Sequence, residues 1–136
     1  MRINLSAPRN RRRHLAIIFV CTVTVAAFFA QGVKQKIRFA RGASSATMRG
    51  TVVRGDRDRY YLSAKKGQTM SVKITSEEDN AVFQIYLPGE EKALPGAEDG
   101  DDTKDWSGEL PSDAEYIIVV GGTRGNASYT LKVSIE

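Results

Sequence analysis

Few side chains of this sequence can take part in catalysis by histidine or cysteine. The only histidine, His14, and the only cysteine, Cys21, both lie within the first 32 residues. A Ser-His-Asp or Cys-His nucleophile, a histidine or thiolate zinc site and a disulfide all need these residue types, so residues 33–136 can form none of them. Pairs such as Ser63 with Lys65 or Ser71 with Lys73 arise by chance in strands and carry little weight as nucleophiles.

The carboxylates offer a second kind of chemistry. Residues 98–105 read Glu-Asp-Gly-Asp-Asp-Thr-Lys-Asp, so oxygen ligands recur at a spacing that could cradle calcium. The run lacks the full EF-hand pattern and its bidentate glutamate, and we predict a solvated loop with no metal and no cofactor. A glycosidase with two carboxylates is disfavoured, because few acids fall in the expected strands or at their ends, where placement is rigid.

Binding through an arginine is a third kind of chemistry that the residues could support. Arg124 lies in the glycine-rich stretch Gly-Gly-Thr-Arg-Gly-Asn, residues 121–126, which can form a tight loop that presents one long side chain. A guanidinium offers a planar fork of donors that matches a carboxylate. Taken alone, an arginine in such a loop is most simply a solvated surface residue. Arg124, with Thr123 and Asn126 beside it, is therefore only a candidate for partner binding on the loop geometry.

A second charged turn lies between two expected strands. Arg54, Arg57 and Arg59 alternate there with Asp56 and Asp58. We favour charge pairing within the turn, which contributes little to stability. The alternative is a binding patch, and for it we keep Arg57 and Asp56 among the candidate partner-binding residues.

The N-terminal segment has the layout of a secretory signal. Residues 1–14 carry five arginines and no acid, and an apolar run follows from Leu15 to Ala30. This run is shorter than the ~20 residues that a membrane-spanning helix needs, and small residues follow it. We predict that residues 1–32 are a signal peptide, cleaved after Gly32 or alternatively after Ala27, and that the product is periplasmic. An uncleaved membrane anchor is the other alternative.

Cleavage changes the net charge. The whole chain carries +4, but five of its 20 basic residues and none of its 16 acidic residues lie in the predicted signal peptide. Fifteen basic residues against 16 acids leave about −1 for residues 33–136. The positive charge of the whole chain is therefore no argument for nucleic-acid binding, and we predict no nucleic-acid partner and no membrane association after cleavage. The oligomeric state is left open, a homodimer included.

The pattern of apolar residues predicts an all-β domain over residues 33–136. Apolar residues alternate with polar ones, and turn residues separate the runs at intervals of roughly 8 to 12 residues. We predict a single antiparallel two-sheet β-sandwich, jelly-roll-like, with Tyr60, Tyr116, Tyr129 and Trp106 in its core and a long mobile surface loop over residues 88–104. The expected strands cover residues 33–39, 46–53, 58–63, 69–75, 81–87, 105–110, 116–120 and 128–135.

Several segments together resemble the periplasmic inhibitors of g-type (goose-type) lysozyme. They are residues 38–46, Gly50, residues 58–68, Leu110-Pro111-Ser112 before Tyr116, the Thr123-Arg124 pair and the closing strand with Tyr129. The strand ending in Tyr-x-Leu, the Ala-Lys-Lys-Gly-Gln that follows it and the later Gly-x-Leu-Pro before a tyrosine strand are also similar to the broader pre-peptidase C-terminal type of β-sandwich. The resemblance implies a protein that is not an enzyme and that inserts loops into the saccharide cleft of a g-type lysozyme, with Arg124 facing the acidic groups there. A sandwich that binds saccharide or an envelope protein without inhibiting anything is the alternative.

Overall fold

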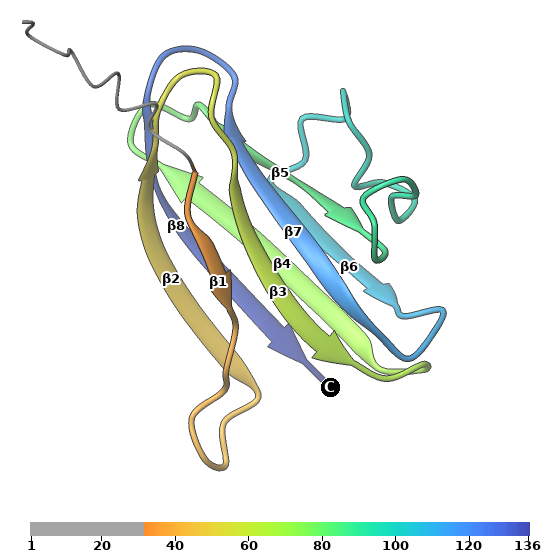
Figure 1. Ribbon diagram of the computed structural model, residues 1–136. Coiled ribbons are helices and arrows are strands. Elements are labelled where there is room, and N and C mark those ends of the chain that lie inside the picture. Colours follow the sequence, from red (N-terminus) through yellow and green to blue (C-terminus); the bar gives the residue numbers. More distant parts are fainter. Residues whose placement is uncertain (1–31) are drawn as a thin grey trace, which may run out of the picture.

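The computed structural model describes residues 32–136, which form eight strands and no helix. Two four-stranded sheets face each other (Figure 1). One sheet has the strand order β1-β3-β7-β5, and the other has the order β2-β8-β4-β6. The strands are β1 (Lys34–Lys36), β2 (Ser45–Val52), β3 (Asp58–Ala64), β4 (Thr69–Ser76), β5 (Ala81–Tyr86), β6 (Asp105–Glu109), β7 (Ala114–Gly122) and β8 (Ala127–Ile135).

The predicted β-sandwich is confirmed, and seven strands begin and end within two residues of the expected bounds. The first strand is shorter than predicted, since only Lys34–Lys36 pair with a neighbour. The prediction of antiparallel pairing is wrong for this strand, because β1 runs parallel to β3, with Lys34 opposite Arg59 and Lys36 opposite Tyr61. The chain then crosses to the other sheet, where β2 pairs with β8. The predicted signal peptide lies outside the described residues, apart from Gly32.

The core lies between the sheets and follows the period of two. In β4, Met70, Val72 and Ile74 are buried while the residues between them face outward, and β8 shows the same alternation. Each such side chain contributes about 1.5–3 kcal/mol when it is fully buried. The prediction of a tyrosine-rich core is confirmed for the three tyrosines, since Tyr60, Tyr116 and Tyr129 are all buried.

Trp106 differs from the prediction, because it is only partly buried at the margin of the core. Its ring packs against Gly108 and Gly96, and its indole Nε1 donates a hydrogen bond of 2.9 Å to the carbonyl oxygen of Pro95. Trp106 belongs to β6, an edge strand that has a neighbouring strand on one side only. Alternation alone does not distinguish an edge strand from a central one.

The long segment between β5 and β6 contains no strand, as predicted, but it is not wholly a surface loop. Leu94 and Ala97 are buried and belong to the hydrophobic core. Backbone hydrogen bonds tie the segment to β5, from Leu94 N to Ile85 O (2.8 Å) and from Ile85 N to Ala97 O (3.0 Å). The prediction of a surface loop was therefore wrong for Leu94 and Ala97. These two apolar residues are isolated in the sequence and show no periodic spacing, so the pattern does not reveal that they cover the edge of β5.

Within residues 32–136, the structure contains no helix that is long and apolar enough to span a membrane.

Candidate functional site

Three loops meet at one end of the sandwich (Figure 1). They are the β2–β3 loop (residues 53–57), the β4–β5 turn (residues 77–80) and the β7–β8 loop (residues 123–126). We call this end the three-loop end. It contains all five residues that the sequence analysis singled out for partner binding: Asp56, Arg57, Thr123, Arg124 and Asn126.

Hydrogen bonds fasten the three loops to one another. The backbone N–H of Arg54 donates to Oδ1 of Asn126 (2.9 Å), which joins the first loop to the third. Nδ2 of Asn80, in the β4–β5 turn, donates to the carbonyl oxygens of Arg124 (3.0 Å) and Asn126 (2.9 Å). Asn126 therefore fixes loop geometry, because its side chain is engaged by the neighbouring loop.

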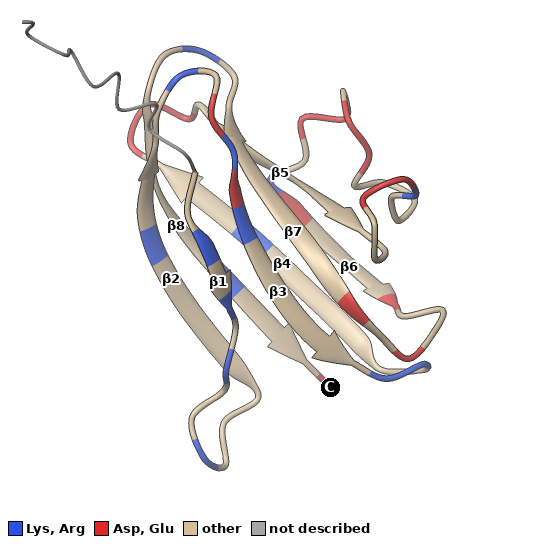
Figure 2. Ribbon diagram, viewed as in Figure 1, with Lys and Arg blue, Asp and Glu red and all other residues tan. Residues whose placement is uncertain are grey.

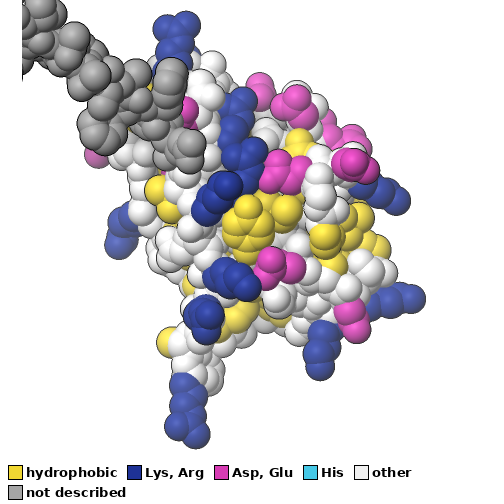
Figure 3. Space-filling model, viewed as in Figure 1, with side chains coloured by type: hydrophobic (Ala, Val, Ile, Leu, Met, Phe, Trp, Pro, Cys, Tyr) yellow, Lys and Arg dark blue, Asp and Glu magenta, His cyan; other side chains and the backbone are white. Residues whose placement is uncertain are grey.

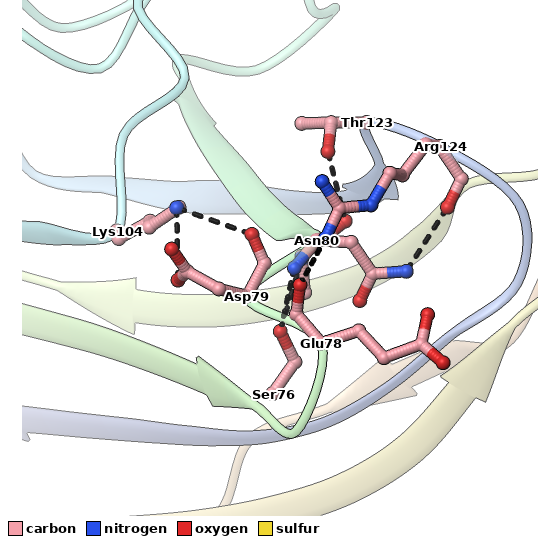
Figure 4. A network of polar contacts seen from close by, with 8 residues as sticks. Ser76, Glu78, Asp79, Asn80, Lys104, Thr123 and Arg124 are labelled. Carbon is pink, nitrogen blue, oxygen red and sulfur yellow. Dashed lines mark hydrogen bonds and ion pairs between the residues drawn. The ribbon is translucent and has the colours of Figure 1, made fainter.

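Asn80 is the centre of this arrangement and is only 1% exposed. Its carbonyl oxygen accepts a hydrogen bond from the backbone N–H of Thr123 (2.8 Å), and its own N–H donates to the hydroxyl of Ser76 (3.0 Å). Figure 4 shows Asn80, the last residue of the β4–β5 turn, beside the loop that carries Arg124. Its backbone N–H, its backbone carbonyl and its Nδ2 are all paired within the protein, so Asn80 positions the loop.

Arg124 is exposed, but its side chain does not extend freely into solvent. Nη2 donates a hydrogen bond of 2.6 Å to the carbonyl oxygen of Glu78, and Figure 4 shows the guanidinium lying over the β4–β5 turn. This bond uses one of the five N–H donors of the guanidinium. The turn is itself held by Lys104, whose ammonium lies 2.9 Å from Oδ1 of Asp79. The guanidinium of Arg124 is thus held against a turn that Lys104 in turn fixes in place.

Arg57 lies beside the same loop. Its Nη1 donates to the carbonyl oxygen of Asp56 (3.0 Å), and its side chain packs over Gly121. A Cβ added at Gly121 would lie 2.9 Å from Nη1 of Arg57, so this glycine provides the space that the arginine occupies. Asp56 is half-buried and closes the turn through its backbone, with its N–H donating to Val53 O (2.9 Å).

The favoured interpretation, charge pairing within the β2–β3 turn, is wrong for Arg59 and Asp58. Nε of Arg59 lies 2.6 Å from Oε1 of Glu90, in the long segment after β5. This hydrogen bond raises the pKa of the Arg59 guanidinium. Asp58 is buried and accepts hydrogen bonds from Tyr129 and Val33.

Beneath the three-loop end, a buried polar cluster joins the two sheets. The hydroxyl of Tyr129 donates to Oδ2 of Asp58 and shares a second hydrogen bond with the hydroxyl of Tyr60, each 2.6 Å long. The two tyrosine rings meet edge to face, with centroids 6.5 Å apart. Burial is the largest cause that raises the pKa of Tyr129, followed by its hydrogen bond to Asp58, and burial also raises the pKa of Tyr60.

The surface is divided by charge. Figure 2 shows lysine and arginine on β1 and β2 and both signs alternating at the start of β3, whereas acidic residues are concentrated in the segment after β5 and in the β4–β5 turn. Figure 3 shows a column of basic side chains beside a hydrophobic patch, with acidic side chains mostly on the other side of the patch. The three-loop end therefore presents both signs, since Arg124 lies over an acidic turn that contains Glu77, Glu78 and Asp79.

Hollows of different size lie at the surface beside the three-loop end. One of about 100 Å³ is lined by Glu77, Glu78, Asn80, Asn126 and Ser128. A wider and shallower one of about 800 Å³ lies on the outer face of the second sheet, between Arg49 and Thr75. In the part of the chain that the structure describes, no three His, Cys, Asp or Glu side chains gather as metal ligands. The end is suited to contact with a macromolecule more than to enclosure of a small molecule.

Sequence analysis missed the β4–β5 turn as part of this end. The run Glu77-Glu78-Asp79-Asn80 between two strands marks a turn, but it does not show that Asn80 is buried. Nor does it show that the carbonyl of Glu78 binds Arg124, because that contact links residues 46 positions apart.

Comparisons with known proteins agree with this fold. No family model matches the sequence. The inhibitor of g-type lysozyme from Escherichia coli (strain K12) is 33% identical over 107 residues, which are 79% of this chain and 73% of the relative. The crystal structure of a periplasmic inhibitor of g-type lysozyme from Aeromonas hydrophila superposes with a TM-score of 0.64 at 36% identity, covering 78% of this chain and 98% of that one. The pre-peptidase C-terminal domain of a Bacillus anthracis collagenase shares the fold alone, with a TM-score of 0.57 at 14% identity, covering 79% of this chain and 98% of that one.

Proposed function

Since the chain belongs to the family of inhibitors of g-type lysozyme, we propose that it is a periplasmic protein that binds and inhibits a lysozyme of this type. It is not an enzyme. The relatives carry this function in their names, and the similarity extends over most of the described domain. The chemistry of residues 33–136 is consistent with it, because they contain no histidine and no cysteine.

We further propose that the three-loop end is the surface that contacts the lysozyme, with Arg124 as its principal residue. The observation that supports this is the convergence of three loops on Arg124, which is exposed yet held by Glu78 and Asn80. A side chain that is already ordered loses less conformational entropy when it binds than a freely rotating one. The geometry therefore favours binding through this guanidinium.

In this proposal, the guanidinium pairs with a carboxylate in the saccharide cleft of the lysozyme. In the free inhibitor, Nη2 donates to a neutral carbonyl oxygen, whereas a carboxylate would give a charge-assisted and bidentate contact. A cleft that excludes water strengthens such a pair. Thr123 and Arg57 contribute at its margin, as does Asp56, while Asn126 keeps the loop in register with its neighbour.

We also propose that the protein reaches the periplasm through residues 1–32 as a signal peptide that is cleaved after Gly32. The basic and then apolar layout of this segment supports the proposal. Intact-mass analysis of periplasmic material tests it: a chain that begins at Val33 is expected. Full-length chain recovered only from membranes would contradict it.

The experiment that tests the function is inhibition of peptidoglycan lysis. Purified residues 33–136 are added to g-type and to chicken-type lysozyme, and the loss of turbidity of a peptidoglycan suspension is followed. We expect inhibition of the g-type enzyme and little effect on the chicken-type enzyme. Full activity of the g-type enzyme at micromolar concentrations of the added protein would contradict the proposed function. Binding without inhibition, measured by calorimetry, would favour a sandwich that only binds an envelope protein.

A further inference from the structure

The first residue of the sandwich is held at both of its backbone polar groups. The backbone N of Val33 donates a hydrogen bond of 2.8 Å to Oδ1 of Asp58. The carbonyl oxygen of Val33 accepts from the N–H of Arg59 (2.7 Å), and β1 then continues parallel to β3. The pairing of β1 with β3 thus places the nitrogen of Val33, just before β1, at the carboxylate of Asp58.

Asp58 is an unusual partner because it is only 2% exposed. Its other oxygen accepts from the hydroxyl of Tyr129, which in turn is bonded to Tyr60. None of the ion pairs formed within residues 32–136 includes Asp58. Buried carboxylates are normally paired with a cation, since neutral donors compensate only part of the lost hydration.

We propose that Asp58 is a binding site for a new N-terminus: hydrolysis of the Gly32–Val33 peptide bond during export places the α-ammonium group of Val33 against its carboxylate. The inference rests on the processing proposed above. Water adds across the bond, so that Gly32 leaves with a carboxylate and Val33 retains an amine, which takes up a proton. The cation that Asp58 lacks in the precursor is then supplied by the same nitrogen that bonds to it now.

The surroundings of this nitrogen suit an ammonium group. An amide N–H donates one hydrogen bond, whereas an ammonium group donates three. Gly32 lies close to the backbone carbonyl of Arg57, since a Cβ added at Gly32 would collide with that oxygen, so the departure of Gly32 uncovers a carbonyl oxygen near the new N-terminus. Asp58 is the first residue of β3 and directly follows the β2–β3 loop, which belongs to the three-loop end. Cleavage after Gly32 therefore stabilises the start of β3, which anchors the β2–β3 loop of the three-loop end.

The test compares two forms of the mature protein that differ by one residue. One begins at Val33 with a free amine, and the other retains Gly32, so that the nitrogen of Val33 is an amide. Each is prepared with Asp58 and with Asp58→Asn, and unfolding by urea is measured from pH 6 to pH 10. Charge-assisted hydrogen bonds are worth more than neutral ones, and at pH 6 we expect the Val33 form to have an unfolding equilibrium constant about ten-fold smaller than the Gly32 form.

The pH dependence distinguishes the effect of the ammonium charge on Val33 from the effect of removing Gly32. The ordinary pKa of an α-amino group is about 7.7–8.0, and pairing with Asp58 raises it in the folded state. The advantage of the Val33 form is then complete below this range and is lost as pH rises through the raised pKa. The carboxylate that bonds to this nitrogen also bonds to the hydroxyl of Tyr129, which bonds to that of Tyr60. Burial raises the pKa of both tyrosines, so they stay neutral in this range.

Three outcomes would overturn the inference. Equal stability of the two forms at pH 6 would show that the ammonium group gains nothing from Asp58. An advantage that survives in Asp58→Asn, or one that is independent of pH, would assign the effect to the removal of Gly32. A periplasmic chain that begins at Phe28 would remove the new N-terminus itself. If Asp58→Asn does not fold, the pH series on the wild-type pair decides alone. Lysozyme inhibition is measured separately, so failure of the proposed function does not affect this result.

Discussion

The guanidinium of Arg124 is bound to the backbone of Glu78, with Nη2 2.6 Å from the carbonyl oxygen. This contact joins the β7–β8 loop to the β4–β5 turn, and it holds a long side chain in one place at the surface. The acceptor is neutral, so a carboxylate from a partner can replace it with a gain in electrostatic energy. The first prediction follows from this contact.

Replacing Arg124 by alanine should weaken lysozyme inhibition strongly, because it leaves a cleft carboxylate without its partner. The expected loss is about 2–5 kcal/mol in binding, or about 30-fold or more in the inhibition constant. Arg57→Ala should cost less than ~1 kcal/mol, since Arg57 lies in a turn of mixed charge. Arg41→Ala, in the loop between β1 and β2 at the opposite end of the sandwich, is the control and should leave the inhibition constant unchanged. Equal inhibition constants for the wild type and Arg124→Ala would exclude this residue from the interface.

Asn80→Ala should lower both stability and inhibition. Two carbonyl oxygens of the β7–β8 loop would lose their donor in a partly buried site, at a cost of about 1–3 kcal/mol in the free energy of unfolding. The measurement is urea denaturation alongside the inhibition constant. Ser71→Ala serves as the control, because its hydroxyl also makes a side-chain hydrogen bond, but at an exposed site where the change should stay within ~0.5 kcal/mol. Inhibition that persists in Asn80→Ala despite lower stability would show that the loop does not need this support.

The buried tyrosines should make the protein sensitive to high pH. Burial raises the pKa of Tyr129, so the folded state keeps its proton after the unfolded chain has lost it. Stability is therefore complete below about pH 10, the ordinary pKa of tyrosine, and falls above it by about 1.4 kcal/mol per pH unit for each such residue. Tyr129→Phe should lower stability at pH 7, because Oδ2 of Asp58 loses a donor, but should reduce the slope above pH 10. An unchanged slope in the variant would contradict the assignment.

Calcium should leave the melting temperature nearly unchanged. Residues 98–105 carry several acids, but Asp101 already accepts a hydrogen bond from the backbone N–H of Glu98 through Oδ2 (3.0 Å). A ligand that binds only the native state must stabilise it, so thermal melts with millimolar calcium and with a chelator provide the measurement. A clear rise of the melting temperature with calcium would establish a metal site in this loop.

The strands and the core were predictable because they depend on local patterns. Alternation in residues such as Met70, Val72 and Ile74 identifies the buried face of a strand without reference to its neighbours. The turn residues between strands set their bounds to within two positions, apart from β1. The prediction failed where burial depends on a strand's place in the sheet, as for Trp106 on the edge strand β6, and where isolated apolar residues such as Leu94 fold back onto an edge.

The sequence by itself determined that residues 33–136 form a β-sandwich without histidine or cysteine chemistry, and it placed Arg124 in an exposed loop. Only the tertiary structure decided what surrounds that loop. The contacts of Arg124 with Glu78, of Asn126 with Arg54, and of Asp58 with Val33 join residues that are 25 to 72 positions apart. Such contacts depend on which strands lie side by side, and β1 pairs in parallel with β3 while β7 and β8 lie in different sheets. Period and turn chemistry report on neighbours along the chain, so they do not determine this order.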